Sequence, residues 1–264
     1  MTASAVPETR RERRRRTRSR ATFTSVLGEL LLTAGVLVLL FVAWQMWIGD
    51  IIIAAQNNEK GNALSQEWAQ QPAPDPPEAT TDEETGETWY EPPILDHPDE
   101  GEVFANMRIP RFGDDYNVQI AGGTSRAVTL DKIGIGLYTQ SKMPGEVGNF
   151  ALAGHRTTWG KPFNQLDKLQ LGDAIVVETE EGWYTYRFRT LEYVEPTEVE
   201  VLLDVPQMPD VETGERYITL TACSPLYSLA ERIIAYGVFE SFQPRSEGEP
   251  DSLAPVDDVA SPSL

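Results

Sequence analysis

The sequence predicts a mainly β domain, a closed barrel or sandwich of about eight short strands with short helices, preceded by one transmembrane helix. Between residues 103 and 242, short apolar runs alternate with Gly, Pro and Asn, which is the pattern of an all-β domain. Residues 26–48 form a long, nearly uncharged apolar run, which is typical of a membrane-spanning helix. Acidic, Pro-rich segments on both sides of the β-rich region contain too few apolar residues to fold by themselves.

Residues 1–25 are expected to be a disordered cytoplasmic tail. They hold eight Arg against Glu8 and Glu12, although the whole chain has a net charge of −19. Such a run is typical either of a nucleic-acid-binding arm or of a signal that orients a membrane span. The apolar segment that follows favours the second interpretation, because Arg residues beside a span stay on the cytoplasmic side. We therefore expect no nucleic-acid partner.

Residues 26–48 are predicted to be an uncleaved membrane anchor. The run from Leu30 to Ile48 has 19 residues, or about 28 Å of helix, which is close to the thickness of a bilayer core. Trp44 and Trp47 lie at its far end, where aromatic belts occur. A cleaved signal peptide is the alternative, but its apolar region is usually shorter and is followed by small residues. The prediction is a single-pass protein of the cell membrane with an extracytoplasmic body.

Residues 49–101 are predicted to be an extended acidic stalk. They contain thirteen Asp or Glu against Lys60 alone, and seven Pro lie between Pro72 and Pro98. Charge repulsion and proline both favour an extended chain, although a helix that continues to about Gln70 is compatible with the sequence. Residues 244–264 are again acidic and Pro-rich, and we expect a disordered tail there.

Residues 102–243 are predicted to form the folded domain. Period-two alternation and β-branched or aromatic residues predict its strands, at residues 103–109, 118–120, 149–153, 174–179, 183–194, 217–222 and 233–239. Short helical turns are expected at residues 125–132 and 162–169.

Cys223, the only cysteine in the chain, is the candidate nucleophile. It follows the strand at residues 217–222, and Ser224-Pro225 then stops the ladder because proline has no N–H to donate. Arg232 begins the next expected strand, so a fixed positive charge can lie near the thiol and favour a thiolate or an oxyanion. The alternative is a buried cysteine that acts as a small apolar residue.

His155 is the candidate acid/base. It follows the expected strand at residues 149–153, and it is one of two histidines in the chain. Thiol chemistry needs a nearby base or cation, and imidazole can accept and donate a proton near neutral pH. With Cys223 as nucleophile and Arg232 as the oxyanion-stabilising group, the expected product is a thioester acyl-enzyme.

The motifs around these residues resemble those of the sortase family. Thr219-Leu220-Thr221-Ala222-Cys223 is followed by Arg232 nine residues later, and His155 lies upstream. The runs at residues 134–138 (GIGLY) and 143–156 (MPGEVGNFALAGHR) are similar to class E sortases of high-GC Gram-positive bacteria. The resemblance spans roughly residues 103–242.

The resemblance implies an eight-stranded β-barrel and a cysteine transpeptidase, with no metal or other cofactor expected. Such enzymes cleave an LAxTG- or LPxTG-type sorting signal between Thr and Gly, and an amine of a peptidoglycan precursor then releases the acyl group. The implied partners are secreted proteins with a C-terminal sorting signal, a lipid II-like amine and the membrane. These residues are compatible with either signal. They are also compatible with either cell-wall attachment or pilus assembly.

The resemblance also implies roles for individual residues. The family's His, Cys and Arg correspond to His155, Cys223 and Arg232. Tyr138 and Thr221 correspond to positions expected to contact substrate. Ala222 is also expected at the substrate, and it replaces the Thr that usually precedes the cysteine.

Two other classes of protein compete with this interpretation. An L,D-transpeptidase-like enzyme also uses Cys and His, but it places a His or Ser-His-Gly just before the cysteine and an Arg two residues after it. Here Ala222 precedes Cys223, and Pro225 lies two residues after it. The other class is a catalytically degenerate, membrane-tethered binding module, which the complete set of Cys223, His155 and Arg232 argues against.

Overall fold

The computed structural model describes residues 22–44, 48–81, 88–212 and 214–255. The chain divides into two parts, residues 1–47 and residues 48–264. Each part is described by itself below. The expected tail at residues 1–25 lies almost wholly outside the described residues.

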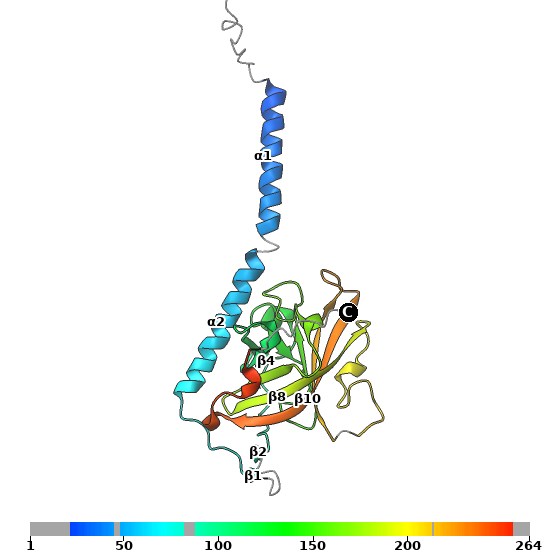
Figure 1. The fold of residues 1–264 in the computed structure, drawn as a ribbon. Coiled ribbons are helices and arrows are strands. Elements are labelled where there is room, and N and C mark those ends of the chain that lie inside the picture. Colours follow the sequence, from blue (N-terminus) through cyan, green and yellow to red (C-terminus); the bar gives the residue numbers. More distant parts are fainter. Residues whose placement is uncertain (1–21, 45–47, 82–87, 213, 256–264) are drawn as a thin grey trace, which may run out of the picture. The chain divides into compact units, whose positions relative to one another are not determined.

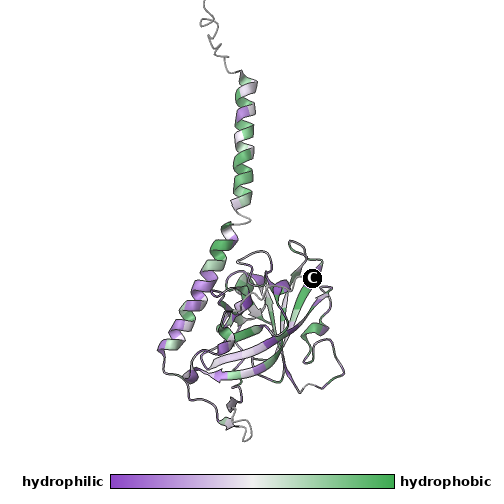
Figure 2. Ribbon diagram, in the orientation of Figure 1, coloured by the Kyte–Doolittle hydropathy of each residue, from purple (hydrophilic) through white to green (hydrophobic). Residues whose placement is uncertain are grey.

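The first part contains one apolar helix, α1 (Phe23–Ala43), with no buried residue. Its 21 residues span about 31 Å, and it is long and apolar enough to cross a membrane (Figure 2). The helix begins and ends earlier than the predicted span of residues 26–48. Trp44 follows it directly, whereas Trp47 lies outside the described residues.

The second part contains a closed barrel of eight strands, which confirms the predicted fold class (Figure 1). The strand order around the barrel is β10-β8-β7-β3-β4-β5-β6-β9. The strands are β3 (Val103–Arg108), β4 (Val118–Gly122), β5 (Ile135–Leu137), β6 (Gly148–Gly154), β7 (Ala174–Glu178), β8 (Gly182–Val194), β9 (Arg216–Ser224) and β10 (Glu231–Pro244). All neighbours pair antiparallel except β4 with β5 and β6 with β9, which are parallel.

Short helices connect some of these strands. The expected turn at residues 125–132 is a π-helix at Arg126–Leu130, and the one at residues 162–169 is a 3-10 helix at Leu166–Lys168. Further 3-10 turns occur at Pro110–Phe112, Glu200–Leu202, Arg245–Glu247 and Asp251–Leu253.

Large apolar and aromatic side chains fill the barrel. The largest fully buried side chains include Tyr184, Tyr186, Phe150 and Phe163. Because successive side chains of a strand point to opposite faces, every second residue of each strand faces this core. The remaining residues are therefore free to build a site on the outside of the barrel.

Residues 49–70 are helical rather than extended, which agrees with the helix to about Gln70 that the sequence allows. Helix α2 (Gly49–Gln70) lies against the barrel, with Asn57, Gly61 and Trp68 buried. The Asn106 Nδ2 atom donates to the Gly61 carbonyl at 2.9 Å, and the Ser65 Oγ atom donates to Glu178 at 2.7 Å. The buried positions recur every three to four residues, so small polar side chains form one helix face. An argument from apolar content alone does not detect such a face.

The end of the expected stalk also packs on the barrel. Strands β1 (Ala79–Thr81) and β2 (Thr88–Tyr90) pair with each other. The following segment is held by a hydrogen bond from the Tyr184 hydroxyl to the Pro93 carbonyl at 2.7 Å, and by an ion pair between Glu91 and Arg216. Burial raises the pKa of Tyr184, which is consistent with a neutral donor at this position.

The prediction of a disordered tail at residues 244–264 is wrong for residues 244–255. Arg245 pairs with the buried Glu178 at 3.1 Å, and Leu253 packs on a small apolar cluster that includes Trp183. The Thr185 and Ser252 hydroxyls are 3.1 Å apart and share a hydrogen bond. Charged and apolar anchors therefore order this segment, while residues 256–264 lie outside the described part of the chain.

Candidate active site

The outer face of β6, β9 and β10 carries the candidate site. On β9, Ile218, Leu220 and Ala222 belong to the barrel core. Strand alternation therefore turns Thr219, Thr221 and Cys223 to the opposite face. The nucleophile candidate sits near the end of the strand, is half-buried and is a free thiol.

Arg232 lies directly across from Cys223. The two residues are register partners in the antiparallel pair of β9 and β10. Opposed residues of such a pair project to the same face, with Cβ atoms about 4.5–5.5 Å apart. The Arg232 Nη1 atom donates to the carbonyls of Leu229 at 3.2 Å and Glu231 at 2.9 Å. Within the described part of the chain, Arg232 forms no ion pair with a carboxylate.

His155 follows the end of the strand on the other side of Cys223. Ala153 of β6 pairs with Thr221 of β9 in parallel register. His155 lies two residues after Ala153, as Cys223 does after Thr221, so the same register brings both to one end and one face of the sheet. The three candidate residues therefore lie in or directly after three neighbouring strands.

Asp131 holds the imidazole of His155. The His155 Nε2 atom is 2.6 Å from the Asp131 Oδ1 atom, and both side chains are mostly buried. An ionised carboxylate only accepts hydrogen bonds, so this contact assigns the proton to Nε2. The Nδ1 atom is then free to accept a proton from the thiol.

Arg156 joins the ends of β6 and β9. Its side chain is 5% exposed, and its Nη1 atom donates to the Ser224 Oγ atom at 3.2 Å. Its Nη2 atom lies 3.4 Å from Asp167. Because Arg156 follows His155 and Ser224 follows Cys223, this contact ties together the two backbone segments that carry the candidate side chains.

The structure separates the three residues expected at the substrate. The Tyr138 hydroxyl and the Thr221 Oγ atom are 2.9 Å apart and share a hydrogen bond on the outer face. Ala222 is 3% exposed and packs in the core. Alternation turns the Ala222 side chain inward, so direct contact between this side chain and a substrate is not expected. The role of Ala222 at the substrate stays a prediction.

A groove of about 840 Å³ runs beside Tyr138. One wall is the loop at residues 199–211, which the Asn149 Nδ2 atom anchors by donating to the carbonyls of Val201 and Leu203. Lining residues include Thr124, Tyr138, Ser141, Ala151, Val205 and Met208. The groove thus combines apolar and hydroxyl groups on the face that carries Cys223.

A second anchor holds the same loop to the barrel. Glu192 accepts hydrogen bonds from Gln207 at 3.1 Å and from the Tyr236 hydroxyl at 2.8 Å. Burial and the Glu192 carboxylate both raise the pKa of Tyr236, so the phenol stays protonated and donates. The wall of the groove is therefore tied to β8 and β10.

The turn between β9 and β10 exposes three apolar side chains next to Cys223. Leu226, Tyr227 and Leu229 are 47%, 69% and 72% exposed. Tyr227 has a φ of 63°, which is uncommon for a residue with a side chain. Such a turn offers apolar contact area beside the thiol.

Sequence reasoning missed Asp131, Arg156 and the loop at residues 199–211. Asp131 has no sequence signal, because only the fold brings it to His155. Arg156 directly follows His155, so its position next to the histidine was the available signal. Among the described residues, no group of three or more His, Cys, Asp or Glu side chains could hold a metal ion.

Comparisons with known proteins agree with this geometry. Residues 107–240 match the family model described as the sortase domain. The chain is 36% identical to sortase SrtE1 of Streptomyces coelicolor over 95% of its own length and 68% of the relative. It is 33% identical to sortase SrtE2 of the same organism, over 86% of each chain. A crystal structure of sortase E1 from Streptomyces coelicolor with a tripeptide in the active site has a TM-score of 0.54 and 39% identity, and the match covers 59% of this chain and 99% of that one.

Proposed function

The chain belongs to the sortase family of cysteine transpeptidases, with a class E-like sequence, and we propose that it joins secreted proteins to the cell wall. The proposed substrate is a C-terminal LAxTG- or LPxTG-type signal, cleaved between Thr and Gly. The proposed acceptor is an amine of a peptidoglycan precursor. The observation that carries this proposal is the pairing of Cys223 with Arg232, with His155 at the end of the neighbouring strand.

Acylation is the first half of the proposed reaction. The thiol proton passes to His155, and the sulfur of Cys223 attacks the carbonyl carbon of the signal's Thr. Arg232 stabilises the negative oxygen of the tetrahedral intermediate. His155 then donates its proton to the departing amine of Gly as the C–N bond breaks, which leaves a thioester on Cys223.

Deacylation reverses these roles with a new nucleophile. An acceptor amine attacks the thioester carbonyl and gives a proton to His155. The C–S bond breaks, and the sulfur of Cys223 leaves with a proton returned by the histidine. A new amide bond joins the protein to the acceptor, and the enzyme is regenerated.

The groove beside Tyr138 supports a peptide substrate. Its hydroxyl-lined floor and apolar loop suit an extended segment with a Leu side chain and a polar Thr. The sortase E1 relative was solved with a tripeptide in its active site, which fits a peptide in the same position here. Tyr138 is the residue that we propose to influence the choice between Ala and Pro in the signal.

Helix α1 supports a membrane location. We propose that it anchors the chain as a single span, with the Arg-rich residues 1–25 in the cytoplasm and the barrel outside. Its length suits a bilayer core. The membrane would then also be where a lipid-linked acceptor is met.

The test uses the full chain in detergent micelles with two fluorogenic peptides, one LAxTG and one LPxTG, each with and without a soluble amine. The wild type is expected to cleave between Thr and Gly and to transfer the acyl fragment to the amine. Cys223→Ala removes the nucleophile and should abolish both reactions. His155→Ala should lose roughly 10²–10⁴-fold in rate, while both variants keep the wild-type circular dichroism and thermal transition.

Leu171→Ala is the matched control, because Leu171 is 74% exposed and lies outside the candidate site. Its activity should equal that of the wild type. Cleavage that persists in Cys223→Ala would rule out the proposed mechanism. A wild type that cleaves neither peptide, although iodoacetamide alkylates Cys223, would show that the acyl substrate is a different one.

A further inference from the structure

Three isoleucine side chains at the start of α2 are exposed to solvent. Ile48, Ile51 and Ile52 are 47%, 62% and 46% exposed. Figure 2 shows that the apolar residues at this end of α2 give way to polar residues along the rest of the helix. A soluble helix of this kind would normally turn its apolar residues toward the core, so this turn of α2 has an apolar surface without a partner in the described structure.

Trp159 is also exposed, on a loop that packs beside the start of α2 although it is distant in the sequence. Its side chain is 41% exposed and its φ is 56°, a backbone conformation that is costly for a bulky residue. The next residue, Gly160, lies so close to α2 that an added Cβ would be 3.1 Å from the Ala54 nitrogen and 3.1 Å from Ile53 Cγ2. The loop that presents Trp159 therefore rests on the first turns of α2.

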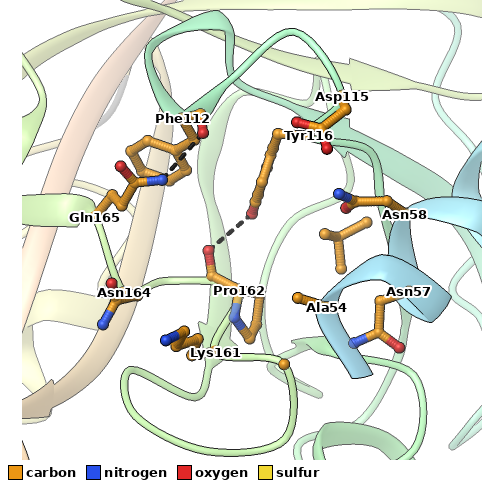
Figure 3. Close-up of a pocket in the computed structure, with 12 residues that line it drawn as sticks. Ala54, Asn57, Asn58, Phe112, Asp115, Tyr116, Lys161, Pro162, Asn164 and Gln165 are labelled. Carbon is orange, nitrogen blue, oxygen red and sulfur yellow. Dashed lines mark hydrogen bonds between the residues drawn. The ribbon is translucent and has the colours of Figure 1, made fainter. Parts of the chain in front are cut away.

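Further contacts secure this loop beside the helix. Figure 3 shows Lys161 and Pro162 across a cavity of about 180 Å³ from Asn57 and Asn58 of α2. The Tyr116 hydroxyl donates to the Pro162 carbonyl at 3.1 Å. The start of α2 and the Trp159 loop thus lie side by side at one end of the second part of the chain.

The start of α2 and the Trp159 loop belong to the end of the barrel that carries the candidate active site. The Lys60 Nζ atom of α2 donates to the Lys132 carbonyl at 3.4 Å, and Lys132 follows Asp131. Trp159 itself lies four residues after His155 in the chain. The other half of α2 meets the opposite end of the barrel, where the Arg245 guanidinium lies over the Trp68 ring at 5.5 Å.

We propose that Ile48, Ile51, Ile52 and Trp159 form a membrane-contact surface that inserts into the boundary between lipid headgroups and acyl chains. This inference rests on the proposed anchor. Only five residues separate α1 from α2, so the start of α2 lies within about 20 Å of the end of the span in any orientation. Trp and aliphatic side chains favour this boundary, which identifies the lipid surface as the occupant.

The consequence is a fixed height of the active site above the membrane. Trp159 and His155 share one short loop, so insertion of Trp159 holds His155 near the headgroup layer. An amine carried on a lipid-linked acceptor is presented in that layer. The membrane-contact surface would therefore favour deacylation by lipid-linked acceptors over deacylation by soluble amines.

The first experiment measures depth in the bilayer with the full chain in lipid nanodiscs. A Cys223→Ala background receives a single cysteine, labelled with an environment-sensitive fluorophore, at position 51, 66, 89 or 159. Brominated lipids then quench any label that enters the acyl region. Position 51 tests the part of the proposed surface next to the anchor, position 159 tests the distant part, and Gln66 on the same helix is the aqueous control. Trp89 is the matched tryptophan control, since it is 51% exposed but lies beside β10 at the opposite end of the barrel.

The expected result is quenching at positions 51 and 159 and none at positions 66 and 89. A label at position 159 that stays unquenched, while position 51 is quenched, overturns the inference and leaves the anchor intact; the surface would then face another protein. If the chain does not float with lipid at all, the proposed anchor fails together with the inference.

The second experiment measures acceptor choice with Cys223 restored. Trp159→Ser should lower the rate of transfer to a lipid-linked amine by about tenfold, because the effective concentration at the surface is lost. Its transfer to a soluble amine should remain at the wild-type rate, and Trp89→Ser should change neither rate. Equal losses with both acceptors in Trp159→Ser would assign the tryptophan to the fold and overturn the inference.

Discussion

Charged side chains at the two ends of the barrel differ in their burial and in their partners. At the end opposite the thiol, Glu178 and Arg245 form a pair whose side chains are only 1% and 7% exposed. Arg245 also donates to the Glu180 carbonyl at 3.0 Å and lies over the Trp183 ring at 4.7 Å. The second Glu178 oxygen accepts from Ser65 of α2. Both charges are therefore fully partnered.

At the end that carries Cys223, Arg232 and His155 keep hydrogen-bonding atoms that no other described side chain engages. Arg232 donates to backbone carbonyls of its own turn, and Cys223 is half-buried on the same face. His155 has the Asp131 carboxylate on one ring nitrogen only. A charge that keeps unused donors near a reactive atom can stabilise a transition state.

The contrast separates two uses of the same side-chain type. A buried arginine that is paired with a buried carboxylate holds segments together, because removal of its partner leaves an uncompensated charge. A partly exposed arginine with spare donors costs little stability and can serve chemistry. Substitutions at the two ends should therefore change different measurements.

The largest effect is expected at the buried pair. Arg245→Met leaves the Glu178 carboxylate buried without its cation, so the free energy of unfolding should fall by about 3–5 kcal/mol. Chemical denaturation of the full chain in detergent measures this loss. The double variant Glu178→Leu/Arg245→Met should be less destabilised than Arg245→Met, since no lone charge remains. A single variant as stable as the wild type would contradict the proposed role of the pair.

The next effect concerns Arg232. Arg232→Met should lower kcat/KM for the peptide by about 10²–10³-fold, because the developing oxyanion loses its cation. The free energy of unfolding should change by less than about 0.5 kcal/mol. Arg189→Met is the matched control, because Arg189 is an exposed arginine of β8, and its kinetics should match the wild type. If Arg232→Met lowered the free energy of unfolding but not kcat/KM, Arg232 would be a structural residue, as Arg245 is.

A smaller effect is expected at Asp131. Asp131→Asn keeps the shape of the side chain but no longer favours the proton on Nε2 of His155, so kcat should fall by roughly 10–100-fold with little change in KM. Steady-state kinetics with the preferred peptide separates the two constants. Arg126→Met provides the control, because Arg126 lies 3.7 Å from Asp131 but its side chain is 72% exposed. An equal loss in both variants would mean that Asp131 acts only on the local fold.

The smallest effect is expected at the edge of the groove. Tyr138→Phe removes the hydroxyl that bonds to Thr221. We expect the looser groove edge to weaken transition-state binding by about 1 kcal/mol, the size of one hydrogen bond, which is about fivefold in kcat/KM. The ratio of kcat/KM values for LAxTG and LPxTG peptides should change, while alkylation of Cys223 proceeds at the wild-type rate. An unchanged ratio would exclude Tyr138 from signal selection.

The sequence predicted the parts of the fold that depend on local pattern. Strands β6 and β9 are rich in apolar and β-branched residues, so their positions were predicted to within two residues, and strand β10 was found although its length was underestimated. Strand β5 was missed as a strand because Ile135–Leu137 is very short and contains Gly136. Its two strand partners, not its composition, hold it in the sheet.

The parts that escaped prediction depend on contacts between distant segments. The polar face of α2 is buried against Asn106 and Asn117, which no apolar periodicity reveals. Arg245 looks like a surface residue in the sequence, and only the fold brings Glu178 to it. The same reason determines which candidate site residues could be predicted. Cys223, His155 and Arg232 lie in recognisable local motifs, whereas only the fold brings Asp131 to the imidazole.

The parallel pairing of β6 with β9 links catalytic competence to the completion of folding. A parallel pair needs a long crossover, and here the crossover contains β7 and β8. Pairing of segments so far apart in the sequence forms slowly, because the loop entropy is lost before the contacts are gained. Until β9 is seated between β6 and β10, the thiol has neither its imidazole nor its guanidinium. By the proposed mechanism, a partly folded chain therefore cannot cleave peptides, and activity begins only when the barrel has closed.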